Sequence, residues 1–235
     1  MDIKIFGKMN FLSYFYYMFY RPKIFYPKRS YSMLGEDLIV EKFFKNKKKG
    51  FYVDVGCYHP IDGNNTYLLS KKGWSGINID LNAISINLFD RARKNDSNLN
   101  IAISNKSQKI KYYYRKKINM LNTVNKAFAK SSFRKGFKTG SIQSQTLNSV
   151  LDKSKFKNKK IDFLNLDIEG NEINALRSLD LRKYSPKLIC IEIHNNTSGR
   201  STKDFLKKNV IYKFLIKNGY KNIWKNEFSY IFRRK

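Results

Sequence analysis

The segment Phe51-Tyr-Val-Asp-Val-Gly-Cys57 is a short apolar run that ends at an acid and a glycine. Such a run predicts a buried β-strand that leads directly into a loop. Gly56 has no Cβ and would let a ligand cross the end of that strand. Asp54 would either accept backbone N–H bonds from the loop or bind an ammonium group. The segment therefore predicts the first strand of an α/β domain that holds a ligand at its carboxyl end.

Strands and helices are expected to alternate on both sides of this segment. The expected strands are 51–55, 76–80, 99–103, 161–166 and 188–193, with helices at 64–72, 83–94 and 204–217 and a final hairpin over 220–224 and 228–232. This alternation predicts an α/β, Rossmann-like fold with a mostly parallel, doubly wound sheet. The terminal hairpin would add an antiparallel strand at or near one edge.

Two segments depart from the alternation. Residues 1–30 are expected to form an aromatic, basic N-terminal extension, and residues 31–235 one domain. Within that domain, 104–146 is expected to be an irregular insertion, with a strand-like aromatic run at 109–115 and the rest rich in Ser, Asn, Lys and Gly. A long irregular segment inside a compact domain is often a lid over a binding site. A solvated surface excursion is the equally weighted alternative.

The charge balance is strongly basic, with 47 Lys and Arg against 18 Asp and Glu, giving +29. A basic excess of this size can mark a nucleic-acid or anionic-membrane partner. It can also reflect drift in an AT-rich genome, because Lys, Asn, Ile, Tyr and Phe share AT-rich codons. The lysines are scattered rather than gathered on one helix, which favours drift and makes specific nucleic-acid binding the least favoured of the three.

The run from Met9 to Tyr20 is apolar and aromatic but shorter than the roughly 20 residues of a bilayer span. It also lacks the small-residue cleavage site of a signal peptide. Lys8 and Arg21 flank it, so it could lie at a membrane interface as a peripheral contact. The alternative is a helix packed on the domain or on a partner subunit. Cys57 and Cys190 are expected to be reduced thiols in the core, and this predicts a cytoplasmic protein. Peripheral contact with the inner face of the membrane is left open.

Acidic or polar residues end four of the expected strands, at Asp54, Asp80, Asp167 and His194. In open α/β sheets the ligand binds beyond these carboxyl ends. Asp80 follows Gly56 by 24 residues, the position at which an acid can accept both hydroxyls of a ribose. The glycines of a dinucleotide-binding loop are missing after Gly56, which disfavours a pyrophosphate. The pattern predicts a nucleoside cofactor without phosphates.

Four segments together resemble the FkbM-like methyltransferases: Val53-Asp-Val-Gly56, Asp80, Asn100-Ile-Ala-Ile-Ser104 and Leu166-Asp-Ile-Glu-Gly-Asn-Glu172. The resemblance implies a class I methyltransferase fold with S-adenosyl-L-methionine as cofactor. It further implies Asp54 and Gly56 at the methionine moiety, Asp80 at the ribose, and the backbone near Ala102 and Ile103 at the adenine. Cys57-Tyr-His-Pro60 departs from the family pattern, which puts the loop contacts in doubt.

The resemblance also implies O-methylation of a small-molecule or glycan acceptor, commonly a sugar. The proline-aromatic signature of many amino-group methyltransferases is missing after Asn165. A sugar hydroxyl needs a base or a metal ion beside it. The candidates for the base are Asp167, Glu169, Glu172 and His194, with His194 or Asp167 favoured.

Each catalytic candidate has a structural alternative. His194 can be a satisfied histidine at a strand end, and Glu172 can stabilise the start of a helix. His59 lies near the cofactor loop and is a weaker candidate for the substrate site. A divalent metal held by Asp167 and neighbouring acids is compatible with the sequence, but no ligand spacing requires it.

Two other functions remain as alternatives. The first is a methyltransferase that uses the basic surface on RNA, and the second is a non-catalytic membrane-associated protein with a Rossmann-like fold. The oligomeric state is left open.

Overall fold

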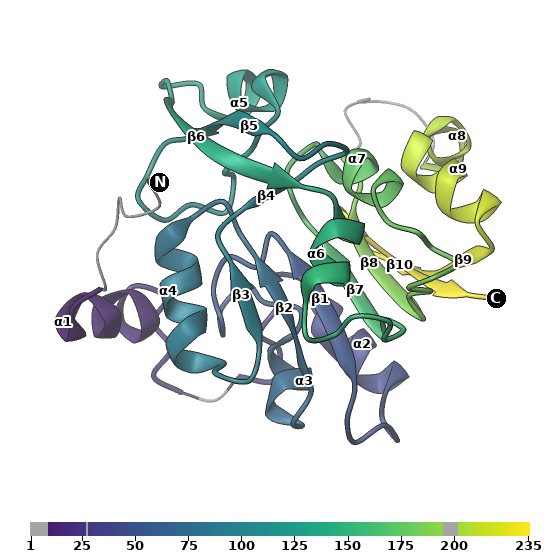
Figure 1. Ribbon diagram of the computed structural model, residues 1–235, viewed down its shortest axis with the longest axis horizontal. Helices are drawn as coiled ribbons and strands as arrows, with labels where there is room; N and C mark the ends of the chain where they lie inside the picture. Colours follow the sequence, from purple (N-terminus) through teal and green to yellow (C-terminus); the bar gives the residue numbers. More distant parts are fainter. Residues whose placement is uncertain (1–8, 27, 195–201) are drawn as a thin grey trace.

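The computed structural model describes residues 9–26, 28–194 and 202–235. Its centre is a seven-stranded sheet with the order β3-β2-β1-β7-β8-β10-β9 (Figure 1). The strands are β1 (Phe51–Val55), β2 (Ser75–Ile79), β3 (Ser97–Leu99), β7 (Phe163–Leu166), β8 (Leu188–Glu192), β9 (Tyr220–Lys225) and β10 (Ser229–Arg234).

The direction of the strands confirms the predicted sheet. Five adjacent strands run parallel to one another: β3, β2, β1, β7 and β8. The hairpin of β9 and β10 closes one side, because β10 pairs antiparallel with both β8 and β9. The strand order reverses between β1 and β7, and the loops after these two strands therefore flank the point where ligands bind in such sheets.

Alternating side chains give the sheet two buried faces. Phe51, Val53 and Val55 of β1 belong to one core, and Tyr52 belongs to the other. The first core includes residues of α6 (Leu147–Lys153), α7 (Glu172–Arg177) and α9 (Val210–Lys217), and the second includes residues of α2 (Glu36–Phe43) and α3 (Tyr67–Lys71). The helix α4 (Ala83–Ala92) contacts β2 and β3.

Two expected elements are divided in the structure. The expected strand 99–103 is β3 in the main sheet and β4 (Ala102–Ile103) in a second sheet. The expected helix 204–217 is α8 (Thr202–Lys208) and α9, because the side chain of Asn209 accepts hydrogen bonds from Ile211 and Tyr212 and starts a new helix.

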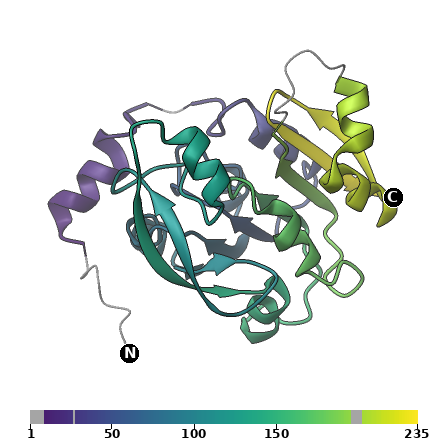
Figure 2. The same ribbon diagram turned by 90° about the horizontal axis from the view of Figure 1, so that it is seen from above.

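The insertion 104–146 is ordered into regular elements, so the expectation of an irregular segment is wrong. It contains β5 (Lys109–Tyr114), which matches the expected strand-like run, together with α5 (Lys126–Ser132) and β6 (Lys138–Gln145). β6 pairs antiparallel with β5 and parallel with β4, which makes a three-stranded sheet. Figures 1 and 2 show this small sheet and α5 lying over one end of the main sheet. The sequence did not predict this small sheet, because the residues of β6 show little alternation of apolar and polar side chains.

The N-terminal extension contains α1 (Phe11–Phe15) and the π-helical turn η1 (Tyr16–Tyr20), followed by turns and irregular chain. Residues 1–8 and 27 of this extension lie outside the described residues. Met18 is buried in a cluster with Ile84 and Leu88 of α4, so one side of the extension packs on the domain. No helix in the described ranges is both long and apolar enough to cross a bilayer.

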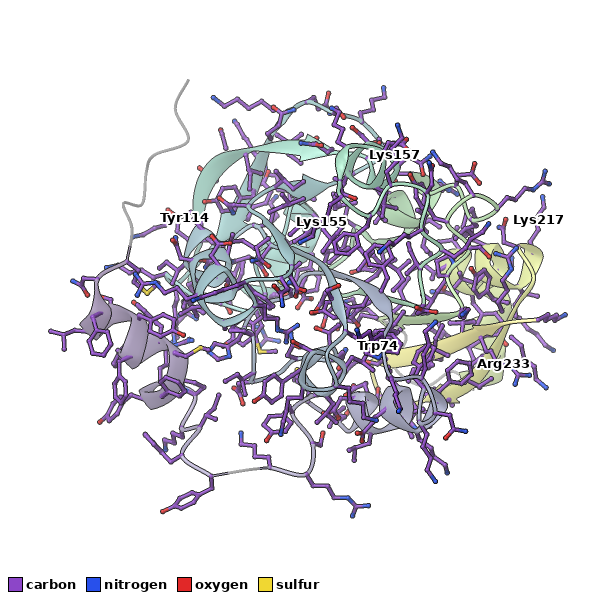
Figure 3. All side chains as sticks on the ribbon, turned by 60° about the horizontal axis from the view of Figure 1, so that its bottom comes forward. Trp74, Tyr114, Lys155, Lys157, Lys217 and Arg233 are labelled. Carbon is purple, nitrogen blue, oxygen red and sulfur yellow. The ribbon has the colours of Figure 1, made fainter. Side chains whose placement is uncertain are left out.

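The basic residues point outward from many different elements. Figure 3 shows Lys157 after α6, Lys217 at the end of α9 and Arg233 on β10 at the outside of the molecule. The positive charge is thus spread widely over the surface, as the scattered lysines of the sequence indicated.

Candidate functional site

The register of two parallel strands brings the acids at their ends together. Leu166 of β7 pairs with Ile191 of β8, so the next residues in line are Asp167 and Glu192. Both side chains fall on the same face, because side chains alternate along each strand. The charge of Glu192 acts directly on the carboxyl group of Asp167. The site therefore begins with an acidic pair across two neighbouring strands.

His194 completes a compact cluster beyond this pair. Its Nε2 atom lies 3.0 Å from a carboxylate oxygen of Glu192 and 3.4 Å from one of Glu169. These contacts with Glu169 and Glu192 raise the pKa of His194 to about 10. The ring also lies 5.2 Å from the ring of Phe128, on α5 of the insertion. The expected histidine and Asp167 thus share one pocket, together with two glutamates.

Burial raises the pKa of two carboxyl groups in this cluster. The pKa of Asp167 is raised well above its usual value by burial and then by the charges of Glu192, Glu169 and Glu172. The pKa of Glu169 is raised by burial, although His194 opposes the shift. Glu169 is only 5% exposed and has a positive φ of 56°, so the loop after β7 turns sharply to aim it inward.

Glu172 has a different position from the other acids. Its carboxylate accepts hydrogen bonds from the backbone N–H groups of Ile168 and Gly170. Burial raises the pKa of Glu172 to about 7. Glu172 therefore holds the loop that carries Asp167 and Glu169, at the start of α7. These contacts are those of a residue that stabilises the start of a helix, which was the structural alternative for Glu172.

A large cavity of about 1240 Å³ opens over this cluster. Asp167, Glu169, Glu192 and His194 are among its lining residues, and α5 supplies part of the opposite wall. Polar side chains from several elements also line it: Asn65, Asn119, Asn125, Ser131 and Ser132. The expected lid segment 104–146 therefore contributes directly to the cavity wall.

A second, narrow cavity of about 30 Å³ lies beside the first. Four of the residues expected at the cofactor line it: Gly56, Asp80, Ala102 and Ile103. Gly56, Asp167, Asn119 and Met120 line both cavities, so they form the junction between them. The two cavities thus meet at the end of β1, next to Asp167.

The walls of the narrow cavity have the chemistry of a nucleoside site. Asp80 accepts N–H bonds from Tyr58 at 2.8 Å and Asn82 at 2.7 Å, which leaves a lone pair on each oxygen for a ribose hydroxyl. The side-chain oxygen of Asn122 is buried without a partner among the described residues, and it can accept from an exocyclic amino group. Ile101 and Val124 add apolar walls for a base. These residues offer the hydrogen-bond acceptors and the apolar surface that a nucleoside needs.

Asp54 does not line either cavity. It is fully buried, and its carboxylate accepts hydrogen bonds from Asn165, Thr66 and Asn64. The guanidinium of Arg93 is bonded to the same Thr66 and Asn64 side chains. Asp54 therefore ties the loop after β1 to β7 and α4, which is the loop-fixing alternative that the sequence left open rather than a contact with the methionine moiety.

Gly56 is needed for a reason that the sequence did not reveal. Its φ is +82°, and a Cβ atom there would lie 1.7 Å from the carbonyl oxygen of Asp167. The close approach that requires glycine is therefore that of the loop after β7, and a ligand over this Cα stays a prediction. Gly56 still lines both cavities through its backbone.

His59 has a structural position and does not line the large cavity. Its Nδ1 atom accepts from the N–H groups of Ile61 and Asp62, and its Nε2 atom lies 3.2 Å from the carbonyl oxygen of Tyr17. Burial lowers the pKa of His59 to about 4. The residue thus joins the N-terminal extension to the loop after β1, and the weak expectation of a substrate role is not supported.

The sequence reasoning missed two residues of the site. Glu192 was present in the strand end Ile191-Glu-Ile-His194, but the pairing of β7 with β8 was needed to place it opposite Asp167. Asn122 lies in the insertion, where no local pattern indicates a contact with the sheet. A search for acids at consecutive strand ends could have found Glu192, and nothing in the sequence indicated Asn122.

Comparison with known proteins identifies one family. The model of the methyltransferase FkbM domain matches residues 54–221. No curated protein matches the sequence.

Two solved structures match most of the chain at low similarity. A TehB-like SAM-dependent methyltransferase from Corynebacterium glutamicum shares 12% identity, with a TM-score of 0.42 over 87% of this chain and 89% of the other. The methyltransferase domain of bacterial CtHen1-C shares 13% identity, with a TM-score of 0.41 over 85% and 96% of the two chains.

Proposed function

The chain belongs to the FkbM methyltransferase family and is an S-adenosylmethionine-dependent methyltransferase, and we propose that it methylates a hydroxyl group of a sugar or glycan. The observation that carries this proposal is the junction at Asp167, where the narrow cavity beside Asp80, Ala102 and Ile103 meets a much larger cavity. The cofactor enters the narrow side, and the acceptor occupies the large side.

The lining of the large cavity suits a glycan. Its volume of about 1240 Å³ is above the usual range for small-molecule sites, ~300–1,000 Å³. Side-chain amides and hydroxyls on its wall can bond to several sugar hydroxyls. Tyr58 and Phe128 line it as well, and aromatic rings can pack on the apolar faces of sugar rings. The combination of many neutral polar groups and aromatic rings favours a carbohydrate over a purely apolar acceptor.

The acids of the cavity argue against the RNA alternative. Glu36, Asp167, Glu169, Glu172 and Glu192 all line it. An RNA strand carries one negative charge on each phosphate, and these carboxylates would repel it at close range. Three basic residues, Arg21, Arg115 and Lys116, also line the cavity. The acids outnumber them, so we favour a neutral acceptor.

The residues of the site have separate tasks in this proposal. Bound S-adenosylmethionine supplies an electrophilic methyl group, and the sulfonium that carried it becomes a neutral thioether. Asp80 binds the ribose hydroxyls. Asp167, at the junction, accepts the proton that the acceptor hydroxyl releases as the new C–O bond forms. Glu172 holds the loop that positions Asp167.

The Asp80→Ala variant tests the cofactor side. We expect its affinity for S-adenosylmethionine, measured by calorimetry, to fall at least about tenfold, which corresponds to ~1.4 kcal/mol. The physical reason is the loss of the carboxylate whose two oxygens can each accept a ribose hydroxyl in the narrow cavity beside Ala102 and Ile103. Asp90→Ala, on the exposed surface of α4, is the control and should bind like the wild type.

Asp80 also predicts a pH dependence of binding. Burial raises the pKa of Asp80 to about 6, so the carboxylate takes up a proton as the pH falls through that value. The neutral acid is a weaker acceptor for ribose hydroxyls, and wild-type affinity should fall between pH 7.5 and 5. Asp80→Asn should lack that part of the pH dependence. Equal binding by wild type and Asp80→Ala at every pH would contradict the assignment.

We also propose that the N-terminal extension contacts an anionic membrane surface. Large apolar side chains on its outer side remain exposed, including Phe11 at 73%, Leu12 at 78% and Tyr26 at 80%. Arg21, Lys23 and other basic residues accompany them, as in helices that lie at a lipid interface. The protein would then act on an acceptor held near the membrane.

Vesicle flotation tests this contact. The full chain should float with vesicles that contain anionic lipid, and the triple variant Phe11→Ser, Leu12→Ser, Tyr26→Ser should stay in the soluble fraction. The matched control changes exposed apolar residues at the other end of the chain, Ile216→Ser and Ile223→Ser, and should still float. Equal flotation of both variants would show that the extension does not mediate binding.

A further inference from the structure

Three side chains at the floor of the large cavity converge on one point. Glu169, Glu192 and His194 each offer one ligand atom, and these atoms lie within 4.8 Å of one another. His194 Nε2 is 3.0 Å from the Glu192 oxygen and 3.4 Å from the Glu169 oxygen. Ligands at right angles on an ion about 2.1 Å away lie about 3.0 Å apart, so the spacing is that of neighbouring ligands on one ion.

The same three atoms have no well-aligned hydrogen-bond partner among the described residues. The Oε2 atoms of Glu169 and Glu192 and the Nε2 atom of His194 are buried and lack a hydrogen bond of good geometry among the described residues. Glu169 is only 5% exposed and is held in place by a loop with positive φ. Buried polar atoms without partners are costly, and their convergence indicates a missing ligand.

The local charge also requires a cation. Asp167, Glu169, Glu172 and Glu192 gather around a single histidine. Over the described part of the chain, no lysine or arginine forms an ion pair with any of these four acids. In a protein with a net charge of +29, this is a concentrated acidic site in which His194, against Glu169 and Glu192, is the one basic partner among the described residues.

We propose that Glu169, Glu192 and His194 bind one divalent metal ion of the oxygen-preferring, six-coordinate class represented by Mn²⁺ and Mg²⁺. Carboxylate oxygens suit these ions, and the single imidazole favours Mn²⁺ over Mg²⁺. Three protein ligands on one side of the ion leave positions open toward the cavity. The sequence suggested Asp167 as a ligand, whereas here Asp167 stands next to the ligand set.

The role of the ion rests on the proposed function. Two adjacent hydroxyls of a sugar can occupy two of the open positions. A divalent ion lowers the pKa of a hydroxyl that it binds. Asp167, which faces Glu192 and lines the junction of the cavities, takes the released proton, and the metal-bound oxygen keeps the electron pair that forms the new C–O bond. The ion would thus select acceptors with a vicinal diol.

The test measures metal binding directly. Mn²⁺ is titrated into the full-length protein, and the free ion is followed by its electron paramagnetic resonance signal. We expect the wild type to bind one Mn²⁺, and Mg²⁺ to compete for the same site. Glu192→Gln and His194→Ala should each weaken binding about 100-fold or more, since loss even of groups that only support a ligand costs ~10–100-fold.

A matched control changes a carboxylate of the same cavity that is outside the cluster. Glu36 lines the cavity, but its oxygens accept from Asn226 and from the backbone of Leu34. Glu36→Gln should therefore bind Mn²⁺ within about threefold of the wild type. Affinity for S-adenosylmethionine, measured on every variant, shows whether the variant is folded.

The results separate this proposal from the proposed function. If wild type binds S-adenosylmethionine but no Mn²⁺, Mg²⁺, Ca²⁺ or Zn²⁺ up to millimolar concentration, the metal site is overturned and the methyltransferase assignment stands. If Mn²⁺ binds equally to wild type and to the Glu192 and His194 variants, the site lies elsewhere. If Mn²⁺ binds as expected but sugars with a vicinal diol are never methylated, the site stands and the acceptor class fails.

Discussion

Asp167→Asn is expected to lower kcat for methyl transfer about 100- to 10,000-fold, the usual loss when a general base is removed. Asp167 lines both cavities and lies opposite Glu192 at the end of the sheet. An amide of the same shape cannot take the proton from the acceptor hydroxyl. The affinity for S-adenosylmethionine should change by less than about threefold, because ribose binding depends on Asp80.

The measurement combines two readouts. Transfer of a labelled methyl group to a glycoside that the wild type methylates gives kcat, and calorimetry gives the affinity for the cofactor. Asp90→Asn, on the exposed side of α4, is the control for the loss of one charge. A kcat for Asp167→Asn within about tenfold of the wild type would remove Asp167 from the reaction and leave another acid of the cluster as the base.

The second large effect is expected from Gly56→Ala, which should lower the free energy of unfolding by at least about 3 kcal/mol. An alanine at φ +82° is strained by itself. In addition, its Cβ atom would lie 1.7 Å from the carbonyl oxygen of Asp167. Because the obstacle is backbone, relief requires β1 and β7 to separate at their carboxyl ends. Binding of S-adenosylmethionine should be lost together with stability.

Gly73→Ala is the matched control for this substitution. Gly73 has nearly the same φ, +83°, but a Cβ atom there would meet nothing within 4 Å. It should cost only about 1–2 kcal/mol, the strain of the left-handed conformation. Denaturant unfolding of both variants measures the difference. If Gly56→Ala is as stable as Gly73→Ala, the contact with the Asp167 carbonyl is not as close in solution as the structure has it.

The acids of the site illustrate how far a single sequence can be interpreted. Asp80 and Asp167 were predicted because each follows an apolar run, and the end of a parallel strand is where a ligand binds. Their expected neighbours Ala102 and Ile103 line the same narrow cavity as Asp80. Glu192 escaped the prediction because it belongs to the site only through its position opposite Asp167, which depends on a pairing between two distant strands.

The insertion 104–146 is the part of the fold that the sequence predicted least well. Its strand β6 and helix α5 were not predicted, because 138–145 has little apolar alternation. The strand is stabilised by pairing with β5 and β4, and tertiary pairing can override weak local preference. Asn122, Met120 and Phe128 therefore reach the two cavities from a segment whose local sequence indicates only a loop.

The sequence by itself determined the alternation of strands and helices, the strand at 51–55 and the acids at the strand ends. These features follow from local periodicity and from the backbone freedom of glycine, which are properties of short segments. Tertiary structure alone decided that Gly56 faces the backbone of Asp167, that Asp54 is an internal tie, and that Glu169, Glu192 and His194 meet. The physical reason is that these contacts depend on strand register and loop closure between distant segments, which no local pattern specifies.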